Sequence, residues 1–332
     1  MRHSIKIILA LFITFTSCSD DENLDIDKGF QAYVLGRYTD DDDIDHAALF
    51  KNGVLMDLSK SGISGPSKGT DVFVSNGDVY VSVMEVDTKE AHLLKNGKKL
   101  YSTDPSQNAR FNGIYIDGDN VYACGYIIEN NTGVAAVWKN GELTKLSKAD
   151  GTINCSAGAV YADGNEVYVA GTYYELPNNS ASKAIYWVNG QQFLINPTGY
   201  SNRGVDILAV NDDVYVLGQD RYWKNNEEIG LSDGADASHI FSYDGDLYIT
   251  GDLKNDATLW KNDSISYLPT VNEKADTRFV TKDQDDVYVM GATIPFDGTS
   301  LDRQVSIWKN GEEVVTMTLE NVAWFEAMYL VP

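Results

Sequence analysis

Few residues of this chain combine the types and spacing that chemistry requires. His46, His92 and His239 lie far apart in the sequence, and none has a second histidine at the short spacing used by many zinc sites. The chain has no Gly-x-Ser-x-Gly nucleophile motif and no glycine-rich phosphate loop. The sequence therefore predicts no metal site, no cofactor and no enzyme.

Carboxylates are the other candidates for chemistry, since two of them roughly 5–10 Å apart can hydrolyse a glycosidic bond. Asp-Gly and Asp-Asp pairs such as Asp117-Gly118 recur along the chain. They lie between two short apolar runs, where a two-residue hairpin turn is expected. Turn formation explains these pairs without catalysis, and a carbohydrate-active hydrolase or lyase remains the alternative function.

Residues 111–146 show the unit that must position any functional side chain. Asp117-Gly118 separates the first two apolar runs of this segment, and Asn140-Gly141 separates the last two. Both pairs supply the positive φ angles of type I′ hairpin turns. The unit is therefore predicted to be a meander of four short antiparallel strands.

The unit occurs seven times, with a tyrosine in each second strand and an asparagine in the turn after each third strand. The tyrosines are Tyr33, Tyr80, Tyr122, Tyr168, Tyr215, Tyr248 and Tyr288. The asparagines are Asn52, Asn96, Asn140, Asn189, Asn225, Asn262 and Asn310. Successive tyrosines are 33 to 47 residues apart, which is the length of a propeller blade. Because the Val-Tyr-Val strands are apolar on both faces, we predict an all-β, seven-bladed β-propeller of four-stranded antiparallel blades.

The two ends of the chain complete each other in this prediction. The first copy starts at its second strand, near Gln31, whereas the chain ends on an unpartnered first strand, residues 324–331. We expect this C-terminal strand to be the innermost strand of the blade formed by residues 31 to 60. The propeller would then span residues 30–332 and have no free edge at the seam.

Two sets of residues are expected in the core. Five of the six tryptophans occupy one position of the repeat, and we predict that they fill the space between blades rather than serve as exposed platforms for sugars. Cys124 and Cys155 occupy positions where other copies have small or apolar residues. We expect both thiols to be free and buried, with a disulfide bond as the alternative.

Candidate binding residues come from positions that vary between copies. The innermost strands of a propeller line its central channel, so side chains at the starts of the first strands should gather at one mouth. An alignment counted back from the second strands places there Arg110, Asn112, Arg203, Asp206, His239, Arg278, Trp324 and Glu326, beside Lys68 and Ser156. Such a ring could hold an anionic or sugar ligand, because arginine makes bidentate contacts with carboxylates. The alternative is that these residues cap strand ends and pair with nearby aspartates.

Loops between second and third strands form the expected rim. Residues 40–43 are four consecutive aspartates, followed closely by Asp45. We expect a solvated acidic tip here rather than a calcium site, which needs about six to eight converging oxygens. Segments 178–182 and 296–300 are longer loops at the same point of two other blades, where binding function tends to concentrate.

The first residues carry an export signal. Residues 1–17 place Arg2 and Lys6 before an apolar run too short to span a membrane, as in a secretory signal peptide. The segment 15–18, Phe-Thr-Ser-Cys, resembles the relaxed lipobox of Bacteroidetes lipoproteins, although Phe15 stands where leucine is usual, and residues 19–23 resemble the acidic export signal of their surface lipoproteins. The resemblance implies that acyl chains such as palmitate are attached to Cys18 and that residues 18–29 form an acidic tether to the outer membrane. An ordinary cleaved signal peptide is the alternative.

One further motif concerns modification. Asp263-Ser264-Ile265 resembles the short acceptor for O-glycosylation in Bacteroidetes, which makes Ser264 a candidate glycosylation site.

The net charge limits the possible partners. A formal charge of -23 excludes a nucleic-acid reader, whose surface must be basic. The resemblance to Bacteroidetes surface lipoproteins, together with the predicted propeller, implies a cell-surface lipoprotein that acts as a non-enzymatic binding or interaction module, as an accessory subunit of an outer-membrane assembly or nutrient-uptake system. Its partners would be the outer membrane, through the lipid anchor, and either an outer-membrane protein complex or a glycan. A purely structural lipoprotein is a third possibility.

Overall fold

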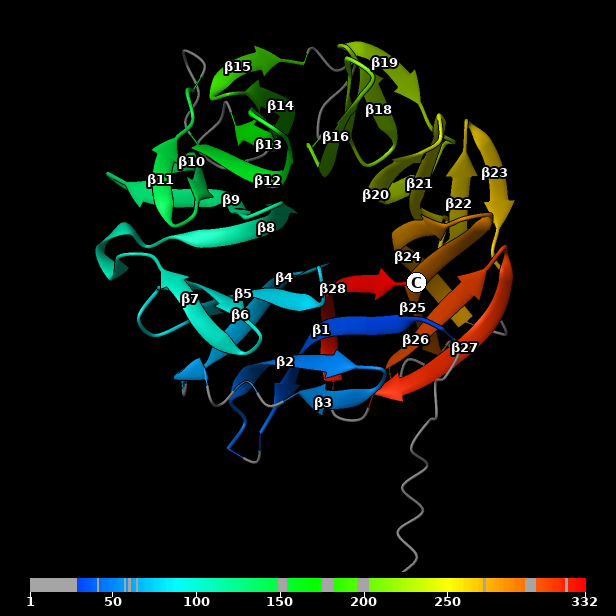
Figure 1. Ribbon diagram of the computed structural model, residues 1–332, viewed down its shortest axis with the longest axis horizontal. Helices are drawn as coiled ribbons and strands as arrows, with labels where there is room; N and C mark the ends of the chain where they lie inside the picture. Colours follow the sequence, from blue (N-terminus) through cyan, green and yellow to red (C-terminus); the bar gives the residue numbers. More distant parts are fainter. Residues whose placement is uncertain are drawn as a thin grey trace, which may run out of the picture.

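The chain forms seven four-stranded antiparallel sheets arranged radially as the blades of a β-propeller, as predicted (Figure 1). The computed structural model describes residues 29–40, 42–56, 58, 61–63, 65–148, 154–174, 182–195, 203–270, 273–295, 303–319 and 322–332. Blade 1 combines both ends of the chain and contains β28 (Val322–Val331), β1 (Gln31–Thr39), β2 (Asp45–Lys51) and β3 (Val54–Met56).

Each of the other six blades consists of four strands that are consecutive in the sequence. Blade 2 contains β4 (Ser67–Ser75), β5 (Asp78–Glu85), β6 (Ala91–Lys95) and β7 (Lys98–Ser102), and the 3-10 turn η2 (Pro105–Gln107) leads from it to blade 3. Blade 3 contains β8 (Arg110–Asp117), β9 (Asn120–Glu129), β10 (Thr132–Lys139) and β11 (Glu142–Lys145). Blade 4 contains β12 (Asn154–Asp163), β13 (Glu166–Tyr174), β14 (Ser182–Val188) and β15 (Gln191–Leu194).

The last three blades follow the same pattern. Blade 5 contains β16 (Asp206–Val210), β17 (Asp213–Leu217), β18 (Arg221–Lys224) and β19 (Glu227–Gly230). Blade 6 contains β20 (Ala235–Tyr243), β21 (Asp246–Leu253), β22 (Asp256–Lys261) and β23 (Ser264–Tyr267). Blade 7 contains β24 (Glu273–Asp283), β25 (Asp286–Pro295), β26 (Arg303–Lys309) and β27 (Glu312–Leu319).

The repeated asparagine has the same structural role in every blade. Asn140 adopts a positive φ of 52° in the turn between β10 and β11. Its Oδ1 accepts a hydrogen bond from the N–H of Val121 at 2.8 Å, and its own N–H donates to the carbonyl of Val121 at 2.8 Å. The same side-chain contact to the start of the second strand is made by Asn52, Asn96, Asn189, Asn225, Asn262 and Asn310. The repeat therefore encodes a clamp between the outer hairpin and the second strand.

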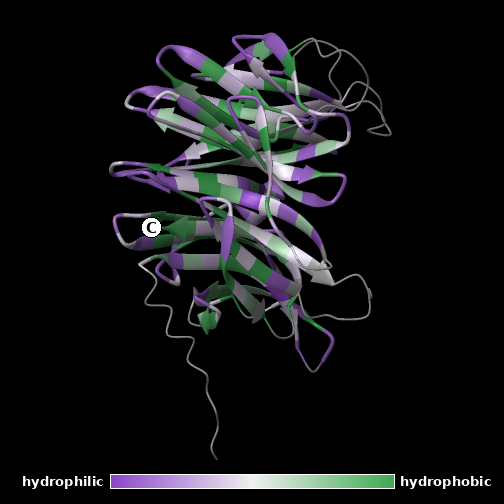
Figure 2. Cartoon of the chain, turned by 90° about the vertical axis from the view of Figure 1, so that its right-hand side faces the viewer, coloured by the Kyte–Doolittle hydropathy of each residue, from purple (hydrophilic) through white to green (hydrophobic). Residues whose placement is uncertain are grey.

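The tryptophan position of the repeat is core, as predicted. Trp138, Trp187, Trp223, Trp260 and Trp308 are each at most 2% exposed. The indole of Trp138 packs edge to face on Phe111, with ring centroids 4.9 Å apart. Hydrophobic residues lie along the strand interiors and hydrophilic ones gather in the turns at the two faces (Figure 2). Burial between the blades thus accounts for the five tryptophans at this position of the repeat.

A β-bulge explains the glycine that ends the Val-Tyr-Val-x-Gly strand. In six blades the first strand has one extra residue at the same level, and these residues are Thr70, Asn112, Gly158, Ser238, Arg278 and Glu326. The bulge brings a first-strand carbonyl against the second strand. A Cβ on Gly125 would lie 1.8 Å from the carbonyl oxygen of Arg110, so only glycine fits there.

The seam of the ring lies within blade 1. Strand β28 pairs antiparallel with β1, from Gln31 opposite Val331 to Tyr38 opposite Val322. It also contacts β4 on one side and β24 on the other, in the middle of the ring (Figure 1). The predicted closure by the C-terminal strand is therefore confirmed.

Several other predictions concern described residues, and others concern residues outside the described ranges. Cys124 and Cys155 are both free and buried, as expected, in the apolar core between blades 3 and 4. Ser264 is exposed on the outer strand β23. The signal peptide, Cys18, the tether as far as residue 28, and loop residues 178–181 and 296–300 lie outside the described residues. The described part of the chain has no helix of the length and hydropathy needed to cross a membrane.

Candidate functional site in the central channel

The first strands of all seven blades enclose a cavity of about 860 Å³ along the propeller axis. Its lining comes from β4, β8, β12, β16, β20, β24 and β28. Small-molecule sites usually occupy roughly 300–1,000 Å³, so the cavity has the size of a ligand pocket. Six of the eight candidate residues line it, namely Asn112, Arg203, Asp206, His239, Arg278 and Glu326.

Strand pairing corrects the alignment of two candidates. At the level where blade 3 has Arg110, blades 6 and 7 have Asp236 and Asp276 rather than His239 and Arg278. Because the bulge also occurs in blades 6 and 7, Asp236 and Asp276 lie the same number of residues before the repeated tyrosine as Arg110 does in blade 3. The alignment that moved His239 and Arg278 to this level was therefore wrong, although both residues face the channel.

The mouth formed by the strand starts is polar, and its charged groups are largely paired. Arg278 donates from Nε and Nη2 to Asp276 Oδ2, at 3.0 and 2.8 Å, and from Nη1 to the carbonyl of Phe325 at 2.6 Å. Glu326 Oε1 accepts from Arg37 Nη2 at 3.1 Å. These contacts join blade 7 to blade 1 and strand β28 to β1. They match the second sequence interpretation, in which charged residues at strand starts pair with nearby groups.

Asn112 also ties two blades together. Its Nδ2 donates to Ser156 Oγ at 3.1 Å and to the carbonyl of Ala157 at 2.7 Å, both in blade 4.

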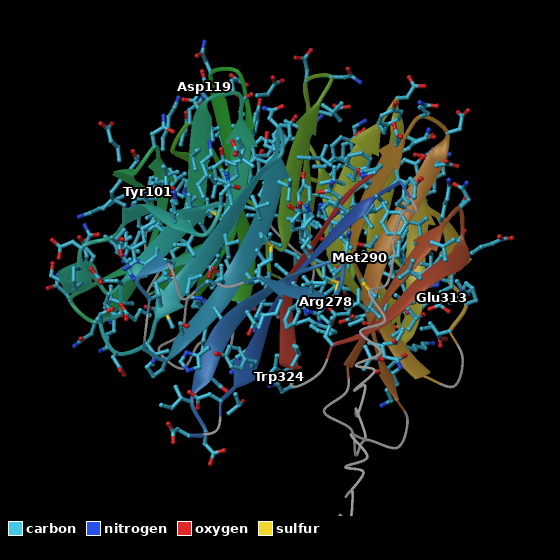
Figure 3. All side chains as sticks on the ribbon, turned by 60° about the horizontal axis from the view of Figure 1, so that its bottom comes forward. Tyr101, Asp119, Arg278, Met290, Glu313 and Trp324 are labelled. Atoms are coloured by element: carbon cyan, nitrogen blue, oxygen red, sulfur yellow. The ribbon has the colours of Figure 1, made fainter. Side chains whose placement is uncertain are left out.

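Two candidates, Arg110 and Trp324, do not line the cavity. Arg110 has a buried Nε without a hydrogen-bond partner among the described residues. Trp324 is 52% exposed and lies near the edge of the molecule opposite the turn that carries Asp119 (Figure 3).

Two partly buried aspartates, Asp71 and Asp206, face the channel one level deeper, and each joins neighbouring blades. Asp71 accepts from the N–H of Val72 at 2.8 Å and from that of Ile114, in blade 3, at 2.7 Å. Burial raises the pKa of the Asp71 carboxyl to about 7, although both N–H donors act in the opposite direction. The sequence analysis did not select Asp71.

Asp206 repeats this contact between blades 5 and 6. Its carboxylate accepts from the N–H of Ile207 at 2.8 Å and from that of Ile240 at 3.0 Å. His239 Nε2 lies 3.9 Å from Asp206 Oδ2. Burial raises the pKa of Asp206 and lowers that of His239, and each group offsets part of the shift of the other. Asp206 and His239 are thus two candidate residues that the fold brings together at the cavity.

Six aromatic rings from six consecutive blades form a belt around the channel. In order around the ring they are His239, Phe279, Tyr329, Phe73, Tyr115 and Tyr161, and all six line the cavity. Successive ring centroids are 4.9, 4.7, 5.0, 5.3 and 4.9 Å apart. We refer to these residues as the aromatic belt. Blade 5 interrupts it with Leu208.

The sequence analysis missed the belt because it considered aromatic platforms at the repeated tryptophan position and not in the first strands. Four of its members occupy every second position of inner strands, at Phe73, Tyr115, Tyr161 and Tyr329, and alternate with core residues. Alternation of this kind in the first strands was the available signal, since residues two apart lie on one face of a strand.

Three further charged groups at the mouth, Arg203, Asp236 and Asp252, complete the site. Arg203 is exposed, lines the cavity and makes no ion pair with another described residue. Asp236 and Asp252 line the cavity nearby. Burial raises the pKa of Asp252, and the charges of Asp236 and Asp276 raise it further. Among the described residues that line the cavity, the mouth therefore offers Arg203 as a cationic donor without an ion pair, and several acidic acceptors, above the ring of aromatic faces.

Comparisons with known proteins identify the fold and no family. No protein-family model matches the chain, and no curated protein matches it. A solved structure of two prolyl endopeptidases is similar over 87% of this chain and 48% of that chain, with 10% identity and a TM-score of 0.52. This chain thus spans about half the length of that one. A nidogen–laminin complex is similar over 90% of this chain and 98% of that chain, with 11% identity and a TM-score of 0.45.

Proposed function

We propose that the protein is a binding module whose ligand enters the central channel and stacks on the aromatic belt. The belt is the observation that supports this most directly. A cavity of about 860 Å³ accepts a small ligand but not a folded protein. The aromatic residues at the repeated tryptophan position are buried and unavailable, whereas the belt faces open space.

The chemistry of the lining favours a short glycan as the ligand. Sugar rings combine an apolar face with a rim of hydroxyls, and the site pairs aromatic faces with separate hydrogen-bonding groups. Tyr115 and Tyr161 would stack on the apolar faces, while Arg203 and Asp236 would bind hydroxyls or a sugar carboxylate. A protein partner would instead contact the rim loops.

The proposed cellular role follows from the location that we expect for the protein, the outer face of the outer membrane. A lipid on Cys18 would hold the propeller at the outer face of the outer membrane, where a glycan-binding accessory lipoprotein could deliver ligand to an uptake system. Replacing Cys18 by Ala should abolish labelling with a palmitate analogue and release the protein from the membrane fraction. Unchanged labelling of C18A would refute the anchor and leave the channel proposal untouched.

Ligand binding can be tested with matched variants. We expect a glycan array to identify a ligand for the wild-type protein, and Tyr161→Ala and Arg203→Ala to weaken its binding about tenfold or more in calorimetry. Tyr267→Ala removes a tyrosine that is 61% exposed on the outer strand β23, so it should bind normally. Binding lost only on changes to the rim, or equal binding by all variants, would overturn the channel site.

A carbohydrate-active enzyme is the second candidate, and Asp71 is the observation that favours it. A carboxyl with a pKa of about 7 could act as a general acid, and Asp206 faces the same cavity. Against this, both oxygens of each aspartate already accept backbone hydrogen bonds. Hydrolysis of an oligosaccharide by the wild type but not by Asp71→Asn would favour the enzyme over the binding module.

A further inference from the structure

A second cluster of chemically competent side chains lies outside the channel, in the hairpin between β5 and β6. Glu85 ends β5, Glu90 lies in the loop and His92 is in β6. Their ligand atoms all lie within 4.8 Å of one another. The sequence analysis expected no metal site because it looked for paired histidines, whereas this group combines one histidine with two glutamates.

His92 is held so that one ring nitrogen points at both carboxylates. Its side chain is 1% exposed, and its Nδ1 lies 2.7 Å from Ser102 Oγ. Its Nε2 lies 3.5 Å from Glu85 Oε2 and 3.9 Å from Glu90 Oε2. Both distances are at or beyond the limit of a useful hydrogen bond. The imidazole is therefore positioned by Ser102, and among the described residues its Nε2 makes only these long contacts to Glu85 and Glu90.

The hairpin backbone fixes the two glutamates. The N–H of Glu85 donates to the carbonyl of Glu90 at 3.0 Å, and the N–H of Lys89 donates to the carbonyl of Glu85 at 3.0 Å. Thr88 Oγ1 donates to Glu85 Oε2 at 3.0 Å. The glutamate side chains are only 14% and 23% exposed. Their placement is thus a property of the hairpin rather than of two free surface side chains.

The charges of this arrangement call for a cation. If Nδ1 donates to Ser102, the lone pair of Nε2 faces two carboxylates, a repulsive arrangement unless a positive charge lies between them. Lys99 makes no ion pair with either glutamate in the described part of the chain.

We propose that Glu85, Glu90 and His92 bind a divalent transition-metal ion of the zinc class. Neutral imidazole with carboxylate oxygens is a donor set that suits Zn²⁺, Mn²⁺ or Fe²⁺ better than Ca²⁺ or Mg²⁺. Bonds of about 2.0–2.2 Å to zinc put tetrahedral ligand atoms roughly 3.3–3.6 Å apart, close to the spacing of Nε2 and Glu85 Oε2. The Ser102 hydroxyl then fixes the ring as partners of metal-bound histidines usually do.

Three protein ligands leave a coordination position for water or for a donor atom from outside the chain. Glu85 is paired with Ser67 at the start of β4, so the hairpin lies on the face of the propeller that carries the polar mouth of the channel. The site does not depend on the channel proposal, because none of its three residues lines the cavity.

Calorimetric titration of the untagged protein with ZnCl₂ tests the site. We expect one equivalent to bind, and Glu85→Gln and Glu90→Gln each to weaken binding at least tenfold while retaining the wild-type circular dichroism spectrum. Glu90→Gln matters most, since the partly exposed loop residue can change without disturbing the core that holds His92. Zinc should also raise the melting temperature of the wild type but not of Glu90→Gln.

His46→Asn is the matched control. His46 contacts Asp40 Oδ2 at 2.9 Å in the corresponding hairpin of blade 1, and the described residues of that hairpin group no second carboxylate around it. Its replacement should leave zinc binding unchanged. No stoichiometric binding to the wild type, or wild-type affinity in both glutamate variants, would overturn the proposal and show that His92 donates a weak hydrogen bond to Glu85.

Discussion

At the scale of single residues, the channel uses partly buried polar side chains to join blades. Asp71, Asn112 and Asp206 each form hydrogen bonds to the next blade around the ring. A buried polar group costs free energy unless it is hydrogen-bonded, so each of these contacts offsets a burial that the fold imposes. The variable residues at strand starts thus serve ring closure first, and the groups left for a ligand are fewer than the sequence suggested.

Asp71 should make stability depend on pH. Its pKa rises from the ordinary value of 3.8 to about 7 in the folded protein. Between these values the folded state holds a proton that the unfolded state has released, so the contribution of Asp71 is present below about pH 4 and is lost as pH rises through 7. The difference in unfolding free energy between wild type and Asp71→Asn should fall by up to about 1.4 kcal/mol per pH unit in this window. Urea titrations from pH 4.5 to 8 measure it.

Asp119→Asn is the control for this measurement. Asp119 is exposed in the turn between β8 and β9, so its replacement should leave the pH dependence as it is in the wild type. Parallel curves for wild type and Asp71→Asn would mean that the channel hydrates Asp71 enough to keep it ionised.

At the scale of the blade, the repeat predicts its own structure closely because its fixed residues act locally. The asparagine clamp, the turn glycines and the buried tryptophan all act within one blade or against the adjacent one. The β-bulge was not predicted, although Gly125 and its counterparts encode it. A glycine in a strand is compatible with several local structures, and only the carbonyl of Arg110 at its side identifies the reason.

Trp138 gives the sharpest test of blade packing. Trp138→Ala should cost about 3–5 kcal/mol of unfolding free energy, because it removes a fully buried indole and leaves a cavity beside Phe111. Trp324→Ala is the matched control, since that side chain is 52% exposed and its loss should cost far less. Chemical denaturation measures both. Equal costs for the two variants would contradict the division into core and surface tryptophans.

At the scale of the whole molecule, seven blades and a shared blade 1 followed from counting copies. The channel site was harder to predict, because its residues come from six or seven blades and meet only after the ring closes. The ring centroids of Phe279 and Tyr329, for example, lie 4.7 Å apart, although the two residues are 50 positions apart in the sequence. The Glu85, Glu90 and His92 cluster is local in sequence, yet its side chains converge only because of how the hairpin turns.

Ring closure by β28 makes a prediction for the whole chain. Deleting residues 322–332 removes the inner strand of blade 1, exposes the edge of β1 and opens the core that Phe325 and Met328 complete. The truncated protein should aggregate or lose its cooperative melting transition, since an unpaired apolar edge recruits other chains. Deletion of Pro332 alone, which lies beyond the strand, should leave melting unchanged.

A circular permutant distinguishes the effect of losing ring closure from the effect of shortening the chain. Gln31 lies opposite Val331, so a short linker can join the two ends, with new termini opened in the exposed turn at Gly164. This permutant keeps β28 in place and should fold as a monomer, whereas the same permutant lacking residues 322–332 should not. A truncated chain that remains monomeric with the melting temperature of the full-length protein would show that six complete blades and three strands suffice, and that the C-terminal strand is not what closes the ring.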